Sequence, residues 1–467
     1  MNNKYIRLIV DMGIFALGAF GSKLVLFLLL PIYTHVLSDN EYGIADLVFT
    51  FGDLVLPFIS LSIFNGLLRF GLIKGQRQKA LLNASLIFVF GSVITILLTP
   101  ISGLYVPIRE WKWYMCAYVL VHFARSNSLV FLKVKAKNKT YAILSIAQAL
   151  LLVGFNIVFL IVLGMGIQGY LLSTIISNGL LSVLAFALGG MKSDLKEATF
   201  DKLLLKEMVL YSIPFIFNDV SWWVIHSSDK VMIEWLVSGS ALGIYTAASK
   251  IPSLVNVLTS IFSQAWGLAS IKEHDSTNDT SFYSTVFKYF SVFIFGVTII
   301  LISITKPFMD IYVGKAFSES WHYVPLLLVS ASFAAISTFA SGLFGALKQS
   351  KSIMTTTIVA GVVNIIVNYI FINLIGIYGA VIGTVTAYFI VALFRLLILK
   401  NKVNVNFNFV KLGIISTLVI IQASLVSVGY HILLVSIVTI LFFVLISRKE
   451  IKEFVLIGLK SLKIKKR

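Results

Sequence analysis

The residues best suited to chemistry lie on one apolar segment, near residues 208–235, which the sequence predicts to be a helix. Residues that recur there at i, i+4, i+7 and i+11 share one side of the helix: Asp219, Trp223, His226 and Lys230. Asn218, Trp222 and Asp229 form an adjoining row. Indole faces stack on sugar C–H groups, and carboxylate and amide oxygens accept hydroxyl protons, so this side suits a polyhydroxylated ligand. The alternative is structural: the tryptophans pack between helices, Asp219 is paired, and Lys230 snorkels.

Arg125 is a second candidate, because a cation inside an apolar helix must face protein or water. It lies about 12 Å from the helix end marked by Lys133, with His122 one turn earlier on the same face. Arg125 either lines a cavity and contacts an anionic group, or forms a structural pair or snorkels. We expect His122 to be a core histidine.

Two further cations are close in depth to carboxylates. Lys23 and Asp53 lie about 22 and 16 Å below the turn that joins their helices, and Lys250 and Asp229 lie about 12 and 14 Å below a corresponding turn. The sequence therefore suggests two ion pairs, Lys23–Asp53 and Asp229–Lys250. Each pair is either a static brace or switches partners when substrate or a proton enters.

Composition gives the class of protein. Of 467 residues, 58% are hydrophobic and 12% charged, whereas a soluble domain carries about 25% charged residues. We therefore expect an all-α polytopic membrane protein. The single Cys116 excludes an intramolecular disulfide or a thiolate metal cluster and is expected to serve packing. No cofactor motif occurs, and we expect the net charge of +18 to reflect cytoplasmic loops, with no nucleic-acid partner.

Fourteen apolar runs are long enough to span a bilayer. They lie near residues 8–36, 44–70, 80–105, 113–134, 140–163, 167–190, 208–235, 242–270, 282–305, 322–347, 352–374, 376–400, 409–429 and 431–447. If the N-terminus is cytoplasmic, 29 of the 38 basic residues, Arg395 among them, fall in inside segments and four fall outside. The positive-inside rule then predicts that both termini are cytoplasmic.

Two repeats divide the chain. At an offset of 200, LSDNEYGI from Leu37 matches VSGSALGI from Val237, and at 212, Asn156, Phe159 and Gly164 match Asn368, Phe371 and Gly376. We expect six-helix lobes at 1–192 and 207–401, related by a pseudo-twofold axis along the membrane normal. Helices thirteen and fourteen (408–447) and a basic cytoplasmic tail (448–467) follow.

The long first helix with GSKLVLFLLLPIYTHVLSDNEYG, followed by GLLRFG before a basic loop, resembles the polysaccharide flippase (Wzx-like) branch of the multidrug/oligosaccharidyl-lipid/polysaccharide exporter superfamily. The resemblance covers essentially the whole chain. It implies a non-enzymatic flippase in the bacterial cytoplasmic membrane that translocates an undecaprenyl-pyrophosphate-linked oligosaccharide by alternating access. Surface polysaccharide synthesis (capsule or O-antigen) and partners such as a polysaccharide polymerase would follow.

Two other functions compete. A cation-coupled multidrug exporter of the same superfamily would hold more carboxylates than cations in its cavity, whereas these spans carry both signs, with Lys23, Arg125 and Lys250 among the cations. A membrane polymerase or glycosyltransferase would offer a large loop with carboxylates or metal ligands, but the outside loops near 105–112 and 306–321 are short. The flippase is therefore the favoured prediction.

Overall fold

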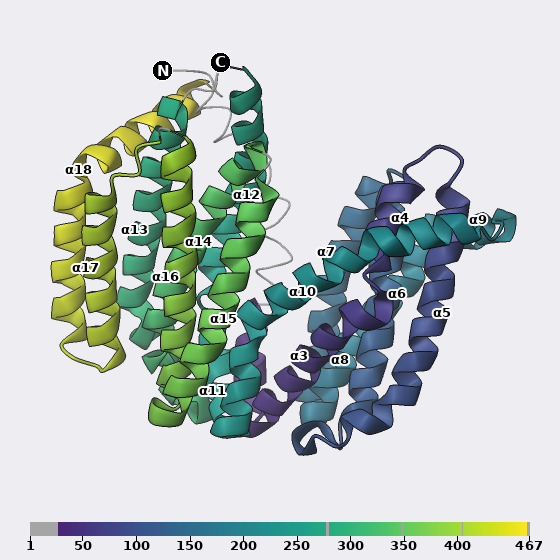
Figure 1. Ribbon diagram of the computed structural model, residues 1–467. Helices are drawn as coiled ribbons and strands as arrows, with labels where there is room; N and C mark the ends of the chain where they lie inside the picture. The colour runs from purple at the N-terminus through teal and green to yellow at the C-terminus, as the bar shows by residue number, and fades with distance from the viewer. Residues whose placement is uncertain (1–26, 277–279, 348, 404, 465–467) are drawn as a thin grey trace. The chain divides into compact units, whose positions relative to one another are not determined.

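The computed structural model describes residues 27–276, 280–347, 349–403 and 405–464 (Figure 1). Within these residues the secondary structure is helical, with no strand. Thirteen helices are long and apolar enough to cross a membrane. The prediction of an all-α polytopic membrane protein is therefore confirmed. Most of the first predicted span, 8–36, lies outside the described residues, which include only its end as α2 (Leu30–Val36).

The chain forms two compact units, and residues 24–243 make up the first. After α2, its elements are α3 (Asp39–Ser60), α4 (Ile63–Gly71), α5 (Arg77–Ser102), the 3₁₀ turn η1 (Val106–Ile108), α6 (Lys112–Val134), α7 (Asn138–Asn156), the π-helix η2 (Ile157–Val162), α8 (Gly166–Gly189), α9 (Met191–Glu197) and α10 (Lys202–Leu236). Helix α6 is central, because it packs against α3, α4, α5, α7 and α8. It therefore positions its own polar side chains beside those of its neighbours.

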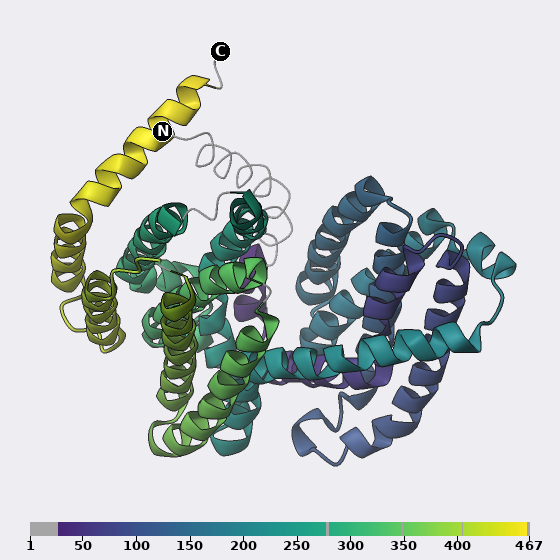
Figure 2. The same ribbon diagram turned by 45° about the horizontal axis from the view of Figure 1, so that its top comes forward.

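The second compact unit covers residues 244–467. The chain enters it within α11 (Gly239–Lys250), and its elements are α12 (Ser253–Ser276), α13 (Thr280–Tyr312), the 3₁₀ segment η3 (Lys315–His322), α14 (Val324–Ala346), α15 (Ser350–Ile375), α16 (Ile377–Lys402), α17 (Phe409–Ser427) and α18 (Ile432–Ile464). Helix α14 is central and packs against α12, α13, α15, α16 and α17. Helices α17 and α18 lie side by side and both pack on α13 (Figures 1 and 2).

Small residues allow α14 to approach its neighbours closely. A Cβ atom on Gly342 would lie 2.4 Å from Trp266 of α12. The Trp266 indole stacks on Phe339 with ring centroids 4.5 Å apart and donates a 2.9 Å hydrogen bond from Nε1 to the Phe339 carbonyl oxygen. This buried aromatic contact lies in the core of the second unit.

Two of the predicted spans are each broken in the structure. The span expected at 44–70 divides into α3 and α4 at Leu61 and Ser62, which have φ values of 49° and 46°. Pro57 lies in the last turn of α3 and has no N–H to continue the hydrogen-bond ladder, which weakens the helix there. The span expected at 242–270 divides into α11 and α12 around Pro252 for a similar reason.

Structure and sequence agree on the two repeats. Ser38 caps α3 by accepting a hydrogen bond from the Glu41 N–H, and Ser238 accepts one from the Ala241 N–H at the start of α11. In the second repeat, Gly164 and Gly376 follow equivalent helices with φ values of 61° and 59°. The division into six-helix lobes stays a prediction, because α10 packs along α3 and α4 inside the first compact unit.

The two copies of the first repeat also touch at their glycines. A Cβ atom on Gly43 would lie 2.3 Å from the Gly239 carbonyl oxygen, and one on Gly243 would lie 1.9 Å from the Asp39 carbonyl oxygen. The backbones of α3 and α11 are therefore in direct contact, which only glycine permits at these positions.

Basic residues predicted in cytoplasmic loops are tied to acidic ones. Asp194 of α9 accepts from Arg77 at 3.2 Å and from Lys135 at 2.5 Å. Asp201 caps α10 by accepting from the Leu204 N–H and pairs with Lys79 at 3.1 Å. These hydrogen bonds, the Leu204 N–H first, lower the pKa of the Asp201 carboxyl.

Arg395, which the sequence assigns to the cytoplasmic side, is buried in the structure. It lies inside α16 and is 3% exposed. Its guanidinium donates to six oxygen atoms of α14 and α15, the hydroxyls of Thr356, Ser337, Ser341 and Thr357 and the carbonyls of Ser337 and Ile353. Among the described residues, no carboxylate lies within ion-pair distance. Its cytoplasmic placement stays a prediction, whereas the contacts show a cation that hydroxyl and carbonyl oxygens satisfy internally.

Candidate functional site

One row of polar residues on α10 follows the broken helix formed by α3 and α4. Four contacts join them: Lys230 Nζ to Asp46 Oδ2 at 2.6 Å, Trp223 Nε1 to the Thr50 carbonyl oxygen at 2.8 Å, Ser62 Oγ to Asp219 Oδ2 at 2.9 Å, and the Gly66 N–H to Ser212 Oγ at 3.1 Å. The break at Ser62 turns its hydroxyl toward α10. Asp219 and Trp223 therefore have partners within the first unit, and Lys230 is paired instead of snorkelling.

The neighbouring row of α10 is exposed. Asn218, Trp222 and His226 recur at i, i+4 and i+8, and all three are exposed. The Trp222 and His226 rings stack with centroids 5.4 Å apart and an interplanar angle of 7°. An amide and an imidazole inside a membrane span are costly against lipid tails. This row, which we name the Trp222–His226 platform, therefore suits the wall of a water-filled cavity.

Asp53 of α3 faces two side chains of α6. Tyr118 donates its hydroxyl to Asp53 Oδ1 at 2.7 Å, and His122 Nδ1 lies 3.5 Å from the same oxygen. The Asp53 side chain is nevertheless 48% exposed. His122 is thus placed beside a carboxylate that remains accessible to a ligand.

Arg125 completes the same face of α6, because Tyr118, His122 and Arg125 recur at i, i+4 and i+7. Arg125 Nη1 donates to Asn178 Oδ1 of α8 at 3.0 Å, and Gln148 Nε2 of α7 donates to that oxygen at 2.5 Å. The partner of the Arg125 guanidinium is thus a neutral amide oxygen, not a carboxylate. Its full positive charge stays available to an anion.

The other predicted residues are placed as follows. Lys23 lies outside the described residues, so its pairing with Asp53 stays a prediction. Asp229 is buried on α10, where its carboxylate accepts from the Lys230 N–H at 2.8 Å, and Lys250 ends α11. The Asp229–Lys250 pair also stays a prediction.

Sequence reasoning did not single out Asp46, Tyr118 or Asn178. A signal existed for Asp46, because it lies two turns before Asp53 on the same face of α3. Tyr118 shares its helix face with His122 in the same way. Asn178 has no comparable signal, since its role comes from the packing of α8 against α6 and α7.

These two groups of side chains in the first unit can each recognise part of an anionic ligand that is rich in hydroxyl groups. Carboxylate oxygens of Asp53 accept hydroxyl protons, Arg125 supplies a cation, and the Trp222–His226 platform supplies flat rings. Within the described part of the chain, no group of three or more His, Cys, Asp or Glu residues is arranged to hold a metal ion.

A comparison with known families gives a match over residues 8–267, more than half of the chain, to the family described as polysaccharide biosynthesis protein. The chain belongs to this family. This membership confirms the resemblance to a polysaccharide family that the sequence indicated. No curated protein matches the sequence significantly.

Solved structures of membrane transporters share the fold of this polysaccharide biosynthesis family member. An inward-facing multidrug resistance MATE family transporter of the MOP superfamily has a TM-score of 0.69 and 15% identity, and covers 86% of this chain and 98% of its own. The lipid II flippase MurJ in an inward closed conformation also has a TM-score of 0.69 and 15% identity, with 94% and 99% covered. A Vibrio cholerae MATE transporter has a TM-score of 0.56 and 14% identity, with 86% and 99% covered. At such identities these similarities show the fold alone.

Proposed function

We propose that this protein is a flippase that moves an undecaprenyl-pyrophosphate-linked oligosaccharide across the bacterial cytoplasmic membrane by alternating access. Membership of the polysaccharide biosynthesis family supports a role in glycan assembly. The fold shared with a lipid II flippase supports movement of a lipid-linked sugar. In this proposal both termini are cytoplasmic, and a polysaccharide polymerase uses the exported units.

The observation that carries the proposal is the exposed Trp222–His226 platform within a membrane span. A sugar ring can stack on parallel aromatic rings while its hydroxyls bond to the adjacent Asn218 amide and to water. Lipid tails cannot form hydrogen bonds with the Asn218 amide. A polar row of this kind is therefore better matched to a glycan than to an apolar drug.

Arg125 has a separate role in this proposal. Its guanidinium contacts the pyrophosphate, which is the part of the substrate that cannot enter hydrocarbon. The Asn178 side-chain oxygen accepts from the guanidinium and is itself held by Gln148, and neither neutral amide cancels the positive charge.

A cation-coupled multidrug exporter is the second candidate, and the shared fold with MATE transporters supports it. One carboxylate of the first unit favours the flippase, because Asp46 is already paired with the Lys230 ammonium. It is therefore a poor site for a coupled cation unless it exchanges partners.

The test replaces Trp222 by Ala and by Phe. We expect Trp222→Ala to lower surface-polysaccharide export about two- to tenfold at normal abundance, which corresponds to the ~0.5–1.5 kcal/mol of an aromatic stack. Trp222→Phe should retain most export, because a flat ring remains. Lipid-linked oligosaccharide should accumulate inside cells that carry the alanine variant.

Trp235→Ala is the matched control, because Trp235 is an exposed tryptophan at the end of the same helix. It should export normally. Wild-type export by Trp222→Ala and His226→Ala, or an equal loss in Trp235→Ala, would exclude the platform as a sugar-binding surface.

A further inference from the structure

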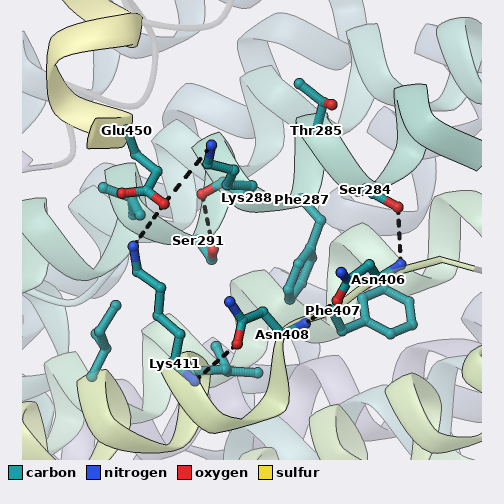
Figure 3. A pocket seen from close by; sticks show the side chains of 13 residues that line it. Ser284, Thr285, Phe287, Lys288, Ser291, Asn406, Phe407, Asn408, Lys411 and Glu450 are labelled. Atoms are coloured by element: carbon teal, nitrogen blue, oxygen red, sulfur yellow. Dashed lines mark hydrogen bonds and ion pairs between the residues drawn. The ribbon is translucent and has the colours of Figure 1, made fainter. Parts of the chain in front are cut away.

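A polar cavity lies within the second compact unit. Its volume is about 300 Å³, and helices α13, α17 and α18 and the loop before α17 form its walls (Figure 3). The charged residues that line it are Lys288, Lys411 and Glu450. Because α13 and α17 begin here and the membrane-spanning part of α18 ends here, the cavity lies at one edge of the spans.

One carboxylate holds the two lysines in place. Glu450 Oε1 lies 2.7 Å from Lys411 Nζ and 3.8 Å from Lys288 Nζ (Figure 3). Lys411 Nζ also donates to the Ile446 carbonyl oxygen at 3.1 Å. Outside the cavity, Glu453 lies 3.2 Å from Lys288 Nζ. The lining itself therefore holds two lysines and one carboxylate, while Glu453 pairs with Lys288 from outside the cavity.

The loop before α17 adds neutral donors. Asn406 and Asn408 use their backbone N–H groups and side-chain oxygens to fix the loop: Asn406 N–H donates to Ser284 Oγ, Asn408 N–H donates to Asn406 Oδ1, and Asn408 Oδ1 accepts from the Lys411 N–H. Neither side-chain NH₂ group donates to a described residue. Both amides line the cavity and are therefore available to a ligand (Figure 3).

The rest of the lining is partly hydroxyl-bearing (Ser284, Thr285 and Ser291) and partly apolar (Phe287, Val292, Phe407, Leu412 and Ile415). The cavity is thus cationic and donor-rich at the membrane edge and apolar toward the membrane interior. Basic pockets between membrane helices are sites for anionic lipid headgroups.

We propose that this cavity binds the headgroup of an anionic phospholipid of the surrounding membrane, with its phosphodiester between Lys288, Lys411 and the two asparagine amides. Two lysines that already share two carboxylates suit the single negative charge of a phosphodiester better than the higher charge of a pyrophosphate. The apolar wall favours a lipid over a soluble phosphate compound. The bound lipid joins α17 and α18 to α13, and this role is independent of the proposed flippase activity.

The test uses the purified full-length protein in neutral detergent, with phosphatidylglycerol, phosphatidylcholine and soluble glycerol 3-phosphate as probes. Native mass spectrometry measures the bound lipid, and thermal unfolding measures protection. We expect phosphatidylglycerol to bind and protect, and the other two probes to do so much less. Lys288→Gln should weaken phosphatidylglycerol binding about fivefold, the effect of one lysine near an anionic lipid surface.

Two variants keep the test independent of folding defects. Glu453→Gln should strengthen binding, because it frees Lys288 from an exposed competing carboxylate, and an unstable protein cannot produce that gain. Lys306→Gln is the matched control, since Lys306 lies on the same helix, is 40% exposed like Lys288, and pairs with Asp310 at 2.8 Å.

The proposal fails if Lys306→Gln and Lys288→Gln weaken binding equally, or if Glu453→Gln weakens it. Equal binding of phosphatidylcholine would overturn the requirement for an anionic lipid. Equal protection by glycerol 3-phosphate would show a site for soluble phosphate, and tighter binding of a lipid-linked pyrophosphate would assign the cavity to the transported substrate.

Discussion

Asp46 and Lys230 form an ion pair inside two membrane spans. Their side chains are 9% and 15% exposed, and the contact is 2.6 Å long. Removing one partner of such a pair leaves a buried charge, which costs about 3–5 kcal/mol. We expect Asp46→Leu and Lys230→Met each to lower the thermal stability and membrane abundance of the protein, and the double variant to recover most of both.

Lys306→Met is the control for this cycle. Lys306 and Asp310 form an exposed pair one helical turn apart, and pairs of that kind contribute about 0.2–1 kcal/mol. If the two single variants at Asp46 and Lys230 are as stable as Lys306→Met, the pair does not stabilise the fold. If the double variant is stable but cannot export polysaccharide, the pair serves transport.

The spacing of polar residues on α10 predicted a broad polar side, but it could not tell which row of that side contacts another helix. Asp219 and Trp223 meet α3 and α4, whereas Trp222 and His226 are exposed. The difference depends on the break at Ser62, a tertiary feature without a periodic signal. Arg125 was identifiable because a cation inside an apolar run is visible in the sequence. Its partner Asn178 was not, because that contact depends on tertiary packing.

At the scale of elements, glycines on α3 and α11 limit which side chains fit where the two helices touch. A Cβ atom on Gly243 would overlap the Asp39 carbonyl oxygen, and backbone atoms cannot move aside as a flexible side chain can. We expect Gly243→Ala to destabilise the protein by about 1–3 kcal/mol, the usual range for overpacking. Thermal unfolding and membrane abundance measure the loss.

Gly154→Ala is the corresponding control, because a Cβ atom there meets no atom within 4 Å. Alanine inside a helix should raise stability by about 0.5–1 kcal/mol relative to glycine. A Gly243→Ala variant as stable as Gly154→Ala would contradict the close contact between α3 and α11.

Hydropathy predicted that the described spans exist, since a run of about 20 apolar residues has few alternatives to a membrane helix. Several ends differ, as for the run at 282–305, where α13 extends from Thr280 to Tyr312. Hydropathy did not predict the breaks at Leu61 and Pro252, because both adjoining segments are apolar and the hydropathy stays high across them. Pro252 was a visible signal that went unused. Positive φ values at Leu61 and Ser62 have no such marker in the sequence.

For the whole molecule, the distribution of basic residues predicts the orientation. Reporter fusions after Lys137 and after Arg467 should be active only with a reporter that works in the cytoplasm, and a fusion after Lys315 only with one that works outside. Fusion-protein abundance is the control. An external signal from either of the first two fusions would reverse or remove the proposed topology.

The repeats show how far sequence reasoning reaches at this scale. Helix ends, caps and left-handed glycines recur at the predicted offsets, as Ser38 and Ser238 or Gly164 and Gly376 illustrate. The assignment of helices to two lobes depends in addition on which helices move together. Packing of α10 on α3 and α4 is a tertiary property that the repeat alone does not contain.

The hydroxyl cage around Arg395 has an electrical consequence. Serine and threonine oxygens satisfy the guanidinium without cancelling its charge, so a full positive charge stays inside α16. Moving one elementary charge across a membrane changes its energy by about 2.3 kcal/mol per 100 mV. Any motion that shifts α16 along the membrane normal therefore does work with or against the transmembrane voltage, in proportion to the fraction of the field that Arg395 crosses.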